Sequence, residues 1–281
     1  MPGTTPKARA LGAELRKARE AAGLGVRQVA AMLETSHATV SRWETGHRSP
    51  KPEDVSAYLA KVGASAEVRQ QLVELARGAD GPHWLSVGMP EQKPQLAGLL
   101  EVERTAAYIA TVSTLLIPGL LQIGDYARAI MREADVPASE IDTRVAVRIG
   151  RQEIVTRRNP VRLDAFIGES ALHADIGGAA VMVDQLHALL AHAERPNVDL
   201  RVIPMQSDWH PGLDGPFLLV ESLDGAGVVH LENRISGLFL HEPADIEVYW
   251  SAVEKVRKVA MSAEDSAKLI AEVIDTKEST I

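Results

Sequence analysis

The first eighty residues repeat apolar side chains at the three- and four-residue spacing of amphipathic helices. This spacing predicts five short helices, at residues 9–22, 26–33, from the N-cap Ser36 to Gly46, from Pro52 through Val62, and at 66–78. Ser36 suits an N-cap because its hydroxyl can accept a backbone hydrogen bond from the first turn. The second and third helices, joined by a short turn, form a predicted helix-turn-helix.

Beyond residue 95 the pattern mixes helical spacing with short apolar runs typical of strands. The predicted helices lie at 96–114, 123–133, 139–158, 179–193, 243–258 and 262–276. Ser139 with Asp142, and Ser262 with Asp265, have the spacing of helix caps. The predicted strands lie at 161–167, 198–203, 216–222 and 227–233, followed by the short "GLFL". A strand, a helix and a strand between 161 and 203 predict a parallel pair with a right-handed crossover.

The chain is therefore predicted to be multidomain. An all-α five-helix domain at 1–80 is followed by a linker at 81–94 and a mixed α/β domain at 95–281. The linker is placed where glycine, proline and polar residues gather in "GPHWLSVGMPEQKP".

Charge is distributed unevenly between these parts. The whole chain has a formal net charge of -8, yet residues 1–51 carry nine lysines and arginines against four glutamates, a balance of +5 that leaves -13 for the rest. A phosphate backbone responds to the charge within about 8 to 10 Å, not to the total. A basic first segment in an acidic protein is compatible with DNA binding.

The stretch "LGAELRKAREAAGLGVRQVAAMLETSHATVSRWETGHRSPKPEDVSAYL" resembles the five-helix domain of lambda-repressor or Cro-like (XRE) regulators. The resemblance implies that the third helix enters the major groove of double-stranded DNA. The implied base-reading residues are His37, Ala38, Thr39 and Arg42. The implied phosphate contacts are Arg27, Gln28, Ser36, His47, Arg48 and Lys51.

Arg42 is the strongest candidate for base reading, since a guanidinium bonds a guanine edge in a bidentate manner, worth about 1 to 3 kcal/mol of discrimination. A phosphate contact or a solvated arginine is the alternative, and His37 has the alternative of a polar surface residue. Arg19 and Glu44 match a pair that joins the first helix to the recognition helix in this family, so their implied role is structural. Where the family usually has glycine in the inter-helix turn, this chain has Glu34, and a left-handed backbone there costs about 1 kcal/mol.

The remainder is similar to the C-terminal domain of WhiJ-type regulators, XRE proteins of actinobacteria. The matching stretches include "LEVERTAAYIATVSTLLIPGLLQIGDYARAI" and "HPGLDGPFLLVE". The resemblance implies transcriptional control, and a small protein encoded nearby as a partner in an antitoxin-like arrangement. We expect a homodimer, because one short helix reads only a few base pairs.

Three functions stay open for the second domain: sensing a partner or ligand for the regulator, antitoxin-like sequestration of a small protein, and small-molecule reception. The candidate partner or effector contact is Ile117, Pro118, Gly119, Leu120, Leu121 and Gln122; the alternative is a proline and glycine bend between packed helices.

No enzymatic constellation is visible in the sequence. The chain has no GxSxG, GxxxxGK or GxGxxG motif, and His187 and His192 are five residues apart, which does not place both on one helix face for a metal. We therefore expect no catalytic residues, no metal and no cofactor. The absence of cysteine, of a secretion signal and of a long apolar run leads us to expect a soluble, cytoplasmic, nucleoid-associated protein without a membrane partner.

Overall fold

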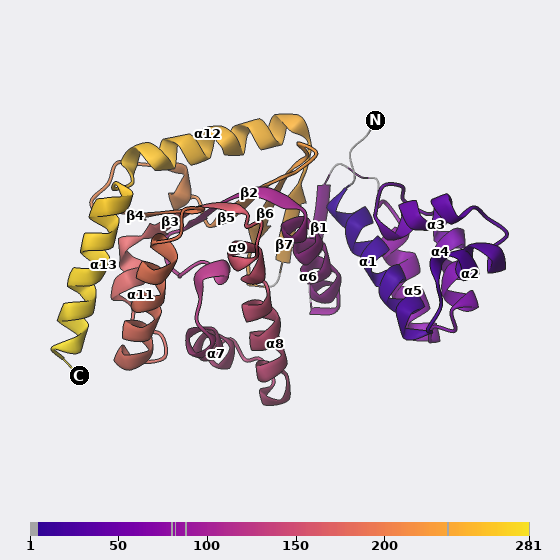
Figure 1. The fold of residues 1–281 in the computed structure, drawn as a ribbon, viewed down its shortest axis with the longest axis horizontal. Coiled ribbons are helices and arrows are strands. Elements are labelled where there is room, and N and C mark those ends of the chain that lie inside the picture. The colour runs from indigo at the N-terminus through magenta and orange to yellow at the C-terminus, as the bar shows by residue number, and fades with distance from the viewer. Residues whose placement is uncertain (1–4, 80, 82, 88, 235, 281) are drawn as a thin grey trace. The chain divides into compact units, whose positions relative to one another are not determined.

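The computed structural model describes residues 5–79, 81, 83–87, 89–234 and 236–280. Five helices form the first part of the chain, as predicted (Figure 1). They are α1 (Pro6–Ala21), α2 (Val26–Met32), α3 (His37–Glu44), α4 (Pro52–Lys61) and α5 (Ala66–Ala76).

The five helices enclose one small apolar core. Leu11, Leu15, Val40, Tyr58 and Leu59 are completely buried. These side chains recur at helical spacing along α1, α3 and α4, so each helix buries one face and leaves its polar face to solvent. The pattern of the sequence therefore fixes both the helices and the faces on which they pack.

The chain divides into two compact units. Residues 1–105 and 222–246 form the first unit, and residues 106–221 and 247–281 form the second.

Besides the five helices, the first unit contains β1 (His83–Val87), α6 (Met89–Arg104), β6 (Gly227–Glu232) and β7 (Ser236–Leu240). These strands pair antiparallel in the order β1-β7-β6. The rings of Trp84 and Phe239 stack across β1 and β7 with centroids 5.2 Å apart. The stretch predicted as a linker thus contains β1 and the start of α6. The sequence did not reveal β1, because the partner of Trp84 is Phe239, which lies far along the chain.

The second unit is built on parallel strands. Its strand order is β5-β2-β3-β4, with β2 (Ala106–Ser113), β3 (Arg162–Gly168), β4 (Val198–Ile203) and β5 (Phe217–Ser222). Strand β2 pairs parallel with β3, and β3 pairs parallel with β4. The predicted parallel pair is confirmed, and the mixed α/β class with it.

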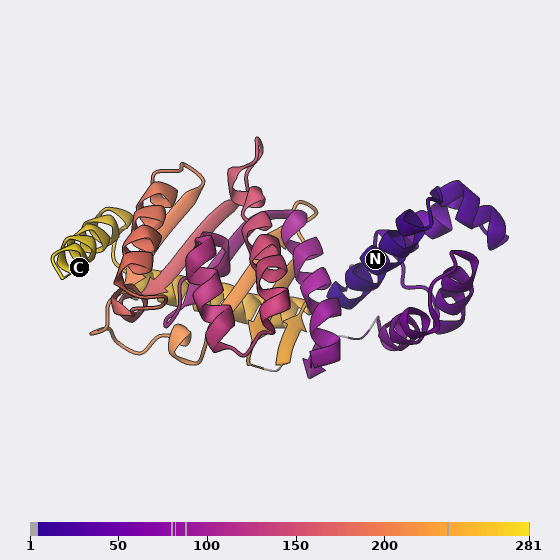
Figure 2. The same cartoon turned by 90° about the horizontal axis from the view of Figure 1, so that it is seen from below.

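Helices cover both faces of this sheet (Figures 1 and 2). α12 (Pro243–Val259) runs along one face, while α7 (Gly124–Glu133) and α8 (Ala138–Gly150) lie on the other. The remaining elements are η1 (Gly119–Leu121), α9 (Glu153–Thr156), α10 (Glu169–His173), α11 (Ala179–Ala193), η2 (Pro211–Leu213) and α13 (Ala263–Glu278).

The helix predictions at 96–114 and 139–158 are wrong. The helix expected over 96–114 ends at Arg104, and Ala106–Ser113 is strand β2, because a buried apolar run does not distinguish helix from strand by its period. The helix expected over 139–158 is α8 followed by α9, and Pro137 rather than Ser139 is its N-cap, with no side-chain bond. The cap at Ser262 is confirmed, since its Oγ accepts from the Asp265 backbone N–H at 3.1 Å.

Candidate nucleic-acid interface

The recognition helix α3 begins at a side-chain cap. Ser36 Oγ accepts a hydrogen bond from the Thr39 backbone N–H at 3.0 Å and lies 2.8 Å from Thr39 Oγ1. The cap satisfies one of the backbone donors that every helix leaves free at its start. The predicted N-cap is confirmed, and it fixes the end of the helix that carries His37 and Ala38.

The two faces of α3 differ in burial. Val40, Trp43 and Glu44 are buried, and the opposite face reaches solvent. His37, Ala38 and Arg42 are exposed and Thr39 is half-buried, so the four predicted base-reading residues all lie on the accessible face.

The predicted phosphate contacts surround this face. Ser36 is exposed, as are Arg27, Gln28, His47, Arg48 and Lys51. Gln28 Oε1 accepts from the Gly25 backbone N–H at 2.7 Å, which holds the Gln28 side chain at the start of α2.

The loop after α3 is tied to the helix end. The Arg48 backbone N–H donates to the Arg42 carbonyl oxygen at 3.2 Å, and His47 Nδ1 lies 2.9 Å from Thr45 Oγ1. Within the described parts of the chain, no side chain pairs with the guanidinium of Arg42 or Arg48. Both cations are thus available to an anionic ligand at the same edge of the domain.

A buried ion pair joins α1 to α3. The Nε and one terminal nitrogen of Arg19 each donate to a Glu44 carboxylate oxygen at 2.8 Å, and the Tyr58 hydroxyl donates to the same carboxylate at 2.7 Å. The hydrogen bonds to Glu44 raise the pKa of Arg19, and burial raises the pKa of Tyr58. Arg19 also donates to the Leu24 carbonyl oxygen, which fixes the turn that leads into α2. The pair has the geometry of a structural support for α3.

Two glycines allow α1 to lie directly against the recognition helix. A Cβ at Gly12 would lie 2.5 Å from the Trp43 carbonyl oxygen. Gly46 has φ of +71°, and a Cβ there would lie 2.8 Å from the Arg9 Cα. Sequence reasoning used Gly46 only as a helix stop and missed Gly12, because the close approach depends on helix packing rather than on local pattern.

The turn between α2 and α3 has the expected strain. Glu34 has φ of +52°, the left-handed region that costs a non-glycine residue about 1 kcal/mol. Glu34 thus adopts the left-handed backbone conformation that glycine usually adopts in such a turn.

Comparisons with known proteins agree with this geometry. A family described as "Helix-turn-helix domain" matches residues 10–72, and a family described as "Domain of unknown function (DUF5753)" matches residues 96–272, more than half of the chain. The chain belongs to the DUF5753 family. No curated protein gives a significant match. The helix-turn-helix domain suggests DNA binding, and DUF5753 carries no assigned activity.

The segment predicted as a partner or effector contact lies inside the DUF5753 region. Gly119 is half-buried, and the other members Ile117, Pro118, Leu120, Leu121 and Gln122 are buried. A hydrogen-bond network holds the segment, because Gln185 Nε2 donates to the Leu121 carbonyl oxygen at 2.8 Å and Gln122 Nε2 donates to that of Ile117 at 2.7 Å. This geometry favours the bend between packed elements, and direct contact with a partner stays a prediction.

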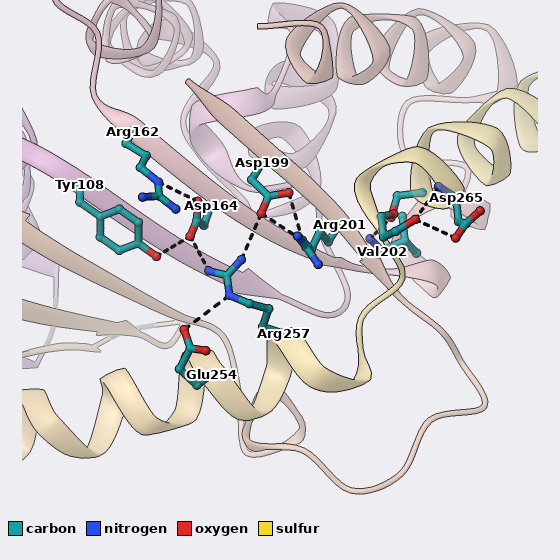
Figure 3. Close-up of polar contacts among 11 residues, drawn as sticks. Tyr108, Arg162, Asp164, Asp199, Arg201, Val202, Glu254, Arg257 and Asp265 are labelled. Atoms are coloured by element: carbon teal, nitrogen blue, oxygen red, sulfur yellow. Dashed lines mark hydrogen bonds and ion pairs between the residues drawn. The ribbon is translucent and has the colours of Figure 1, made fainter. Parts of the chain in front are cut away.

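A polar cluster that the sequence did not reveal joins α12 to strands β2, β3 and β4 of the second unit (Figure 3). Asp164 of β3 is fully buried, and its Oδ2 accepts from the Tyr108 hydroxyl at 2.7 Å and from Arg257. Arg257 also donates to Asp199 at 3.1 Å. Burial raises the pKa of Tyr108. Since a buried carboxylate is tolerated only when paired, the cluster has the character of a structural clamp.

No group of three or more His, Asp or Glu side chains in the described ranges is placed to hold a metal ion. None of the helices among the described residues is long and apolar enough to cross a membrane.

Proposed function

We propose that the chain is a sequence-specific DNA-binding transcriptional regulator of the WhiJ type, in which α3 reads the major groove. One observation carries the proposal: His37, Ala38, Thr39 and Arg42 line the accessible face of α3 while the opposite face is buried. A helix of this size fits the major groove, and side chains at its N-terminal end reach base edges.

The two kinds of contact have different physical consequences. Arg42, on the helix, discriminates among base sequences, whereas Arg48 and Lys51, in or after the loop, neutralise phosphates and add affinity that does not depend on sequence. We also propose a homodimer that binds two half-sites about one helical turn apart, at the nucleoid, without catalysis, metal or cofactor.

The test begins with DNA fragments selected from the genome by the full-length protein. Binding of the enriched sequence and of scrambled duplexes is then measured by fluorescence anisotropy at several salt concentrations. Arg42→Ala is expected to lower discrimination by about 1 to 3 kcal/mol, and Arg48→Ala to weaken all duplexes alike and reduce the salt slope by about 1.

Lys268→Ala is the matched control, because it removes one exposed positive charge from α13, in the second unit. It is expected to change neither the affinity nor the salt slope. If Arg42→Ala weakens every duplex equally and lowers the salt slope, Arg42 is a phosphate contact. If the protein selects no sequence even at low salt, the proposed function is wrong.

A further inference from the structure

Three loops of the second unit leave the sheet at the same edge. The parallel strands β2, β3 and β4 end at Ser113, Gly168 and Ile203, so the loops that follow them meet at their carboxyl ends. Contacts join these loops: a Cβ at Gly168 would clash with the Thr114 carbonyl oxygen, and the Met205 backbone N–H donates to Glu169 at 2.8 Å. Loops at this edge of a parallel sheet are where α/β proteins commonly place binding sites.

Large apolar side chains on these loops face solvent. The exposed fraction is 73% for Leu115, 61% for Met205, 64% for Trp209 and 59% for Leu213. We call these four residues the carboxyl-edge surface. Three of them lie on the long loop between β4 and β5, and long loops in compact domains are commonly functional. Large apolar side chains that are exposed on neighbouring loops are candidates for an interaction site.

The loop that carries most of the surface is anchored rather than loose. His210, next to Trp209, is 2% exposed. A Cβ at Gly212, next to Leu213, would lie 2.9 Å from both the His210 Nδ1 and a methyl carbon of Val112 on β2. Trp209 and Leu213 are therefore held outward by buried neighbours, which reduces the entropy that a partner must remove on binding.

The loop between β4 and β5 carries formal charges of one sign only. The chain has no lysine or arginine from residue 202 to residue 233. Asp208 and Asp214, which flank Trp209 and Leu213 in the loop, are exposed, and Glu169 is half-buried beside Met205. Carboxylates at the rim of an apolar patch attract cationic partners and repel DNA.

We propose that the carboxyl-edge surface binds a cationic amphipathic helix of another protein. Trp209, Met205 and Leu213 pack against the apolar face of the helix, while Asp208 and Asp214 pair with its lysines or arginines. Tryptophan, methionine and leucine side chains supply the apolar contact, and tryptophan is among the residue types that dominate binding energy at interfaces. This function is separate from DNA binding and does not depend on it.

A display library of random 16-residue peptides, panned against the full-length protein, tests the chemistry of the partner. The selected peptides are expected to be net positive, with apolar residues at the i, i+3 and i+4 spacing of one helix face. Binding of a selected peptide to the purified protein is then measured by anisotropy of a dye on the peptide. No enrichment, or enrichment of neutral or acidic peptides, overturns the proposal.

The chain supplies a matched control for the contact residues. Leu213 and Leu223 both stand in the sequence Leu-Asp-Gly and both are exposed, but only Leu213 belongs to the carboxyl-edge surface. The affinity for the peptide is expected to fall about 5-fold or more in Leu213→Ala, about 30-fold in Trp209→Ala, and less than 2-fold in Leu223→Ala. Equal effects of Leu213→Ala and Leu223→Ala contradict the assignment.

The charges are tested separately. The double variant Asp208→Asn and Asp214→Asn is expected to weaken binding about 3- to 10-fold at low salt and less at 1 M salt. Every variant is checked for an unchanged circular dichroism spectrum and an unchanged thermal unfolding midpoint, which shows that the fold is intact whether or not the protein binds DNA. An undiminished affinity in the double variant shows that the partner is not recognised by charge, and overturns the cationic part of the proposal.

Discussion

Removal of one partner of the buried pair between α1 and α3 is expected to destabilise the helical region strongly. Arg19 is 8% exposed and Glu44 is 3% exposed. In Arg19→Met the Glu44 carboxylate loses both 2.8 Å hydrogen bonds and keeps only the one from Tyr58. Leaving a buried charge without its partner costs about 3 to 5 kcal/mol of the free energy of unfolding.

Hydrogen exchange of the α1 and α3 amides measures this loss locally, without requiring the whole chain to unfold in one step. A loss of about 3 kcal/mol corresponds to roughly 150-fold faster exchange. Arg144→Met is the control, because Arg144 pairs with Glu140 at 2.8 Å across one turn of an exposed helix face, where such pairs contribute under about 1 kcal/mol.

A second variant separates the charge from the packing. In Arg19→Met combined with Glu44→Met no charge is left buried, and the Tyr58 hydroxyl still reaches the Leu15 carbonyl oxygen at 3.2 Å. The double variant is therefore expected to be more stable than Arg19→Met alone. The reasoning is refuted if Arg19→Met costs no more than Arg144→Met, or if adding Glu44→Met makes the protein still less stable.

Three further predictions concern stability. Glu34→Gly relieves a φ of +52° and is expected to raise the free energy of unfolding of the helical region by up to about 1 kcal/mol, measured by slower exchange of α2 and α3 amides. Gly46→Ala is expected to cost at least about 2 kcal/mol by the same assay, because a Cβ at φ of +71° meets the Arg9 backbone. Burial lowers the pKa of His192 and His210, so the folded state resists their protonation and stability falls as pH drops below about 6.5. Urea unfolding at several pH values between 7 and 5 gives the free energy of unfolding as a function of pH. In the double variant His192→Gln with His210→Gln this free energy should depend less steeply on pH, by at most about 1.4 kcal/mol per pH unit for each histidine. An unchanged pH dependence contradicts the assignment.

The helical region could be predicted from the sequence because its determinants are local. Ser36 caps a helix within three residues, and Val40 and Trp43 lie one turn apart on a helix whose other face is polar. Such signals specify which side chains face solvent before any tertiary contact is known. The prediction of an exposed, polar face on α3 is confirmed for this reason, and the individual DNA contacts stay predictions.

The elements that were missed depend on partners far away in the chain. Strand β2 has the same apolar character as a buried helix, and only its pairing with residues of β3 more than fifty positions later makes it a strand. Gln122 and Gln185 look like surface residues in the sequence, yet both are buried where they bond the backbone of the 117–122 segment. No local sequence pattern predicts that a glutamine side chain will donate a hydrogen bond to a buried backbone carbonyl oxygen far along the chain.

Arg9 of α1 contacts both the loop that follows α3 and the region that matches DUF5753. The Arg9 backbone lies against Gly46, the residue before His47, while its guanidinium donates to Thr105 Oγ1 at 3.0 Å at the end of α6. Burial lowers the pKa of Arg9, and the charges of Asp224 and Glu101 oppose that effect. A buried guanidinium persists only where such partners surround it. The position of α1 against the loop that follows α3 is therefore set in part by residues that belong to the DUF5753 match.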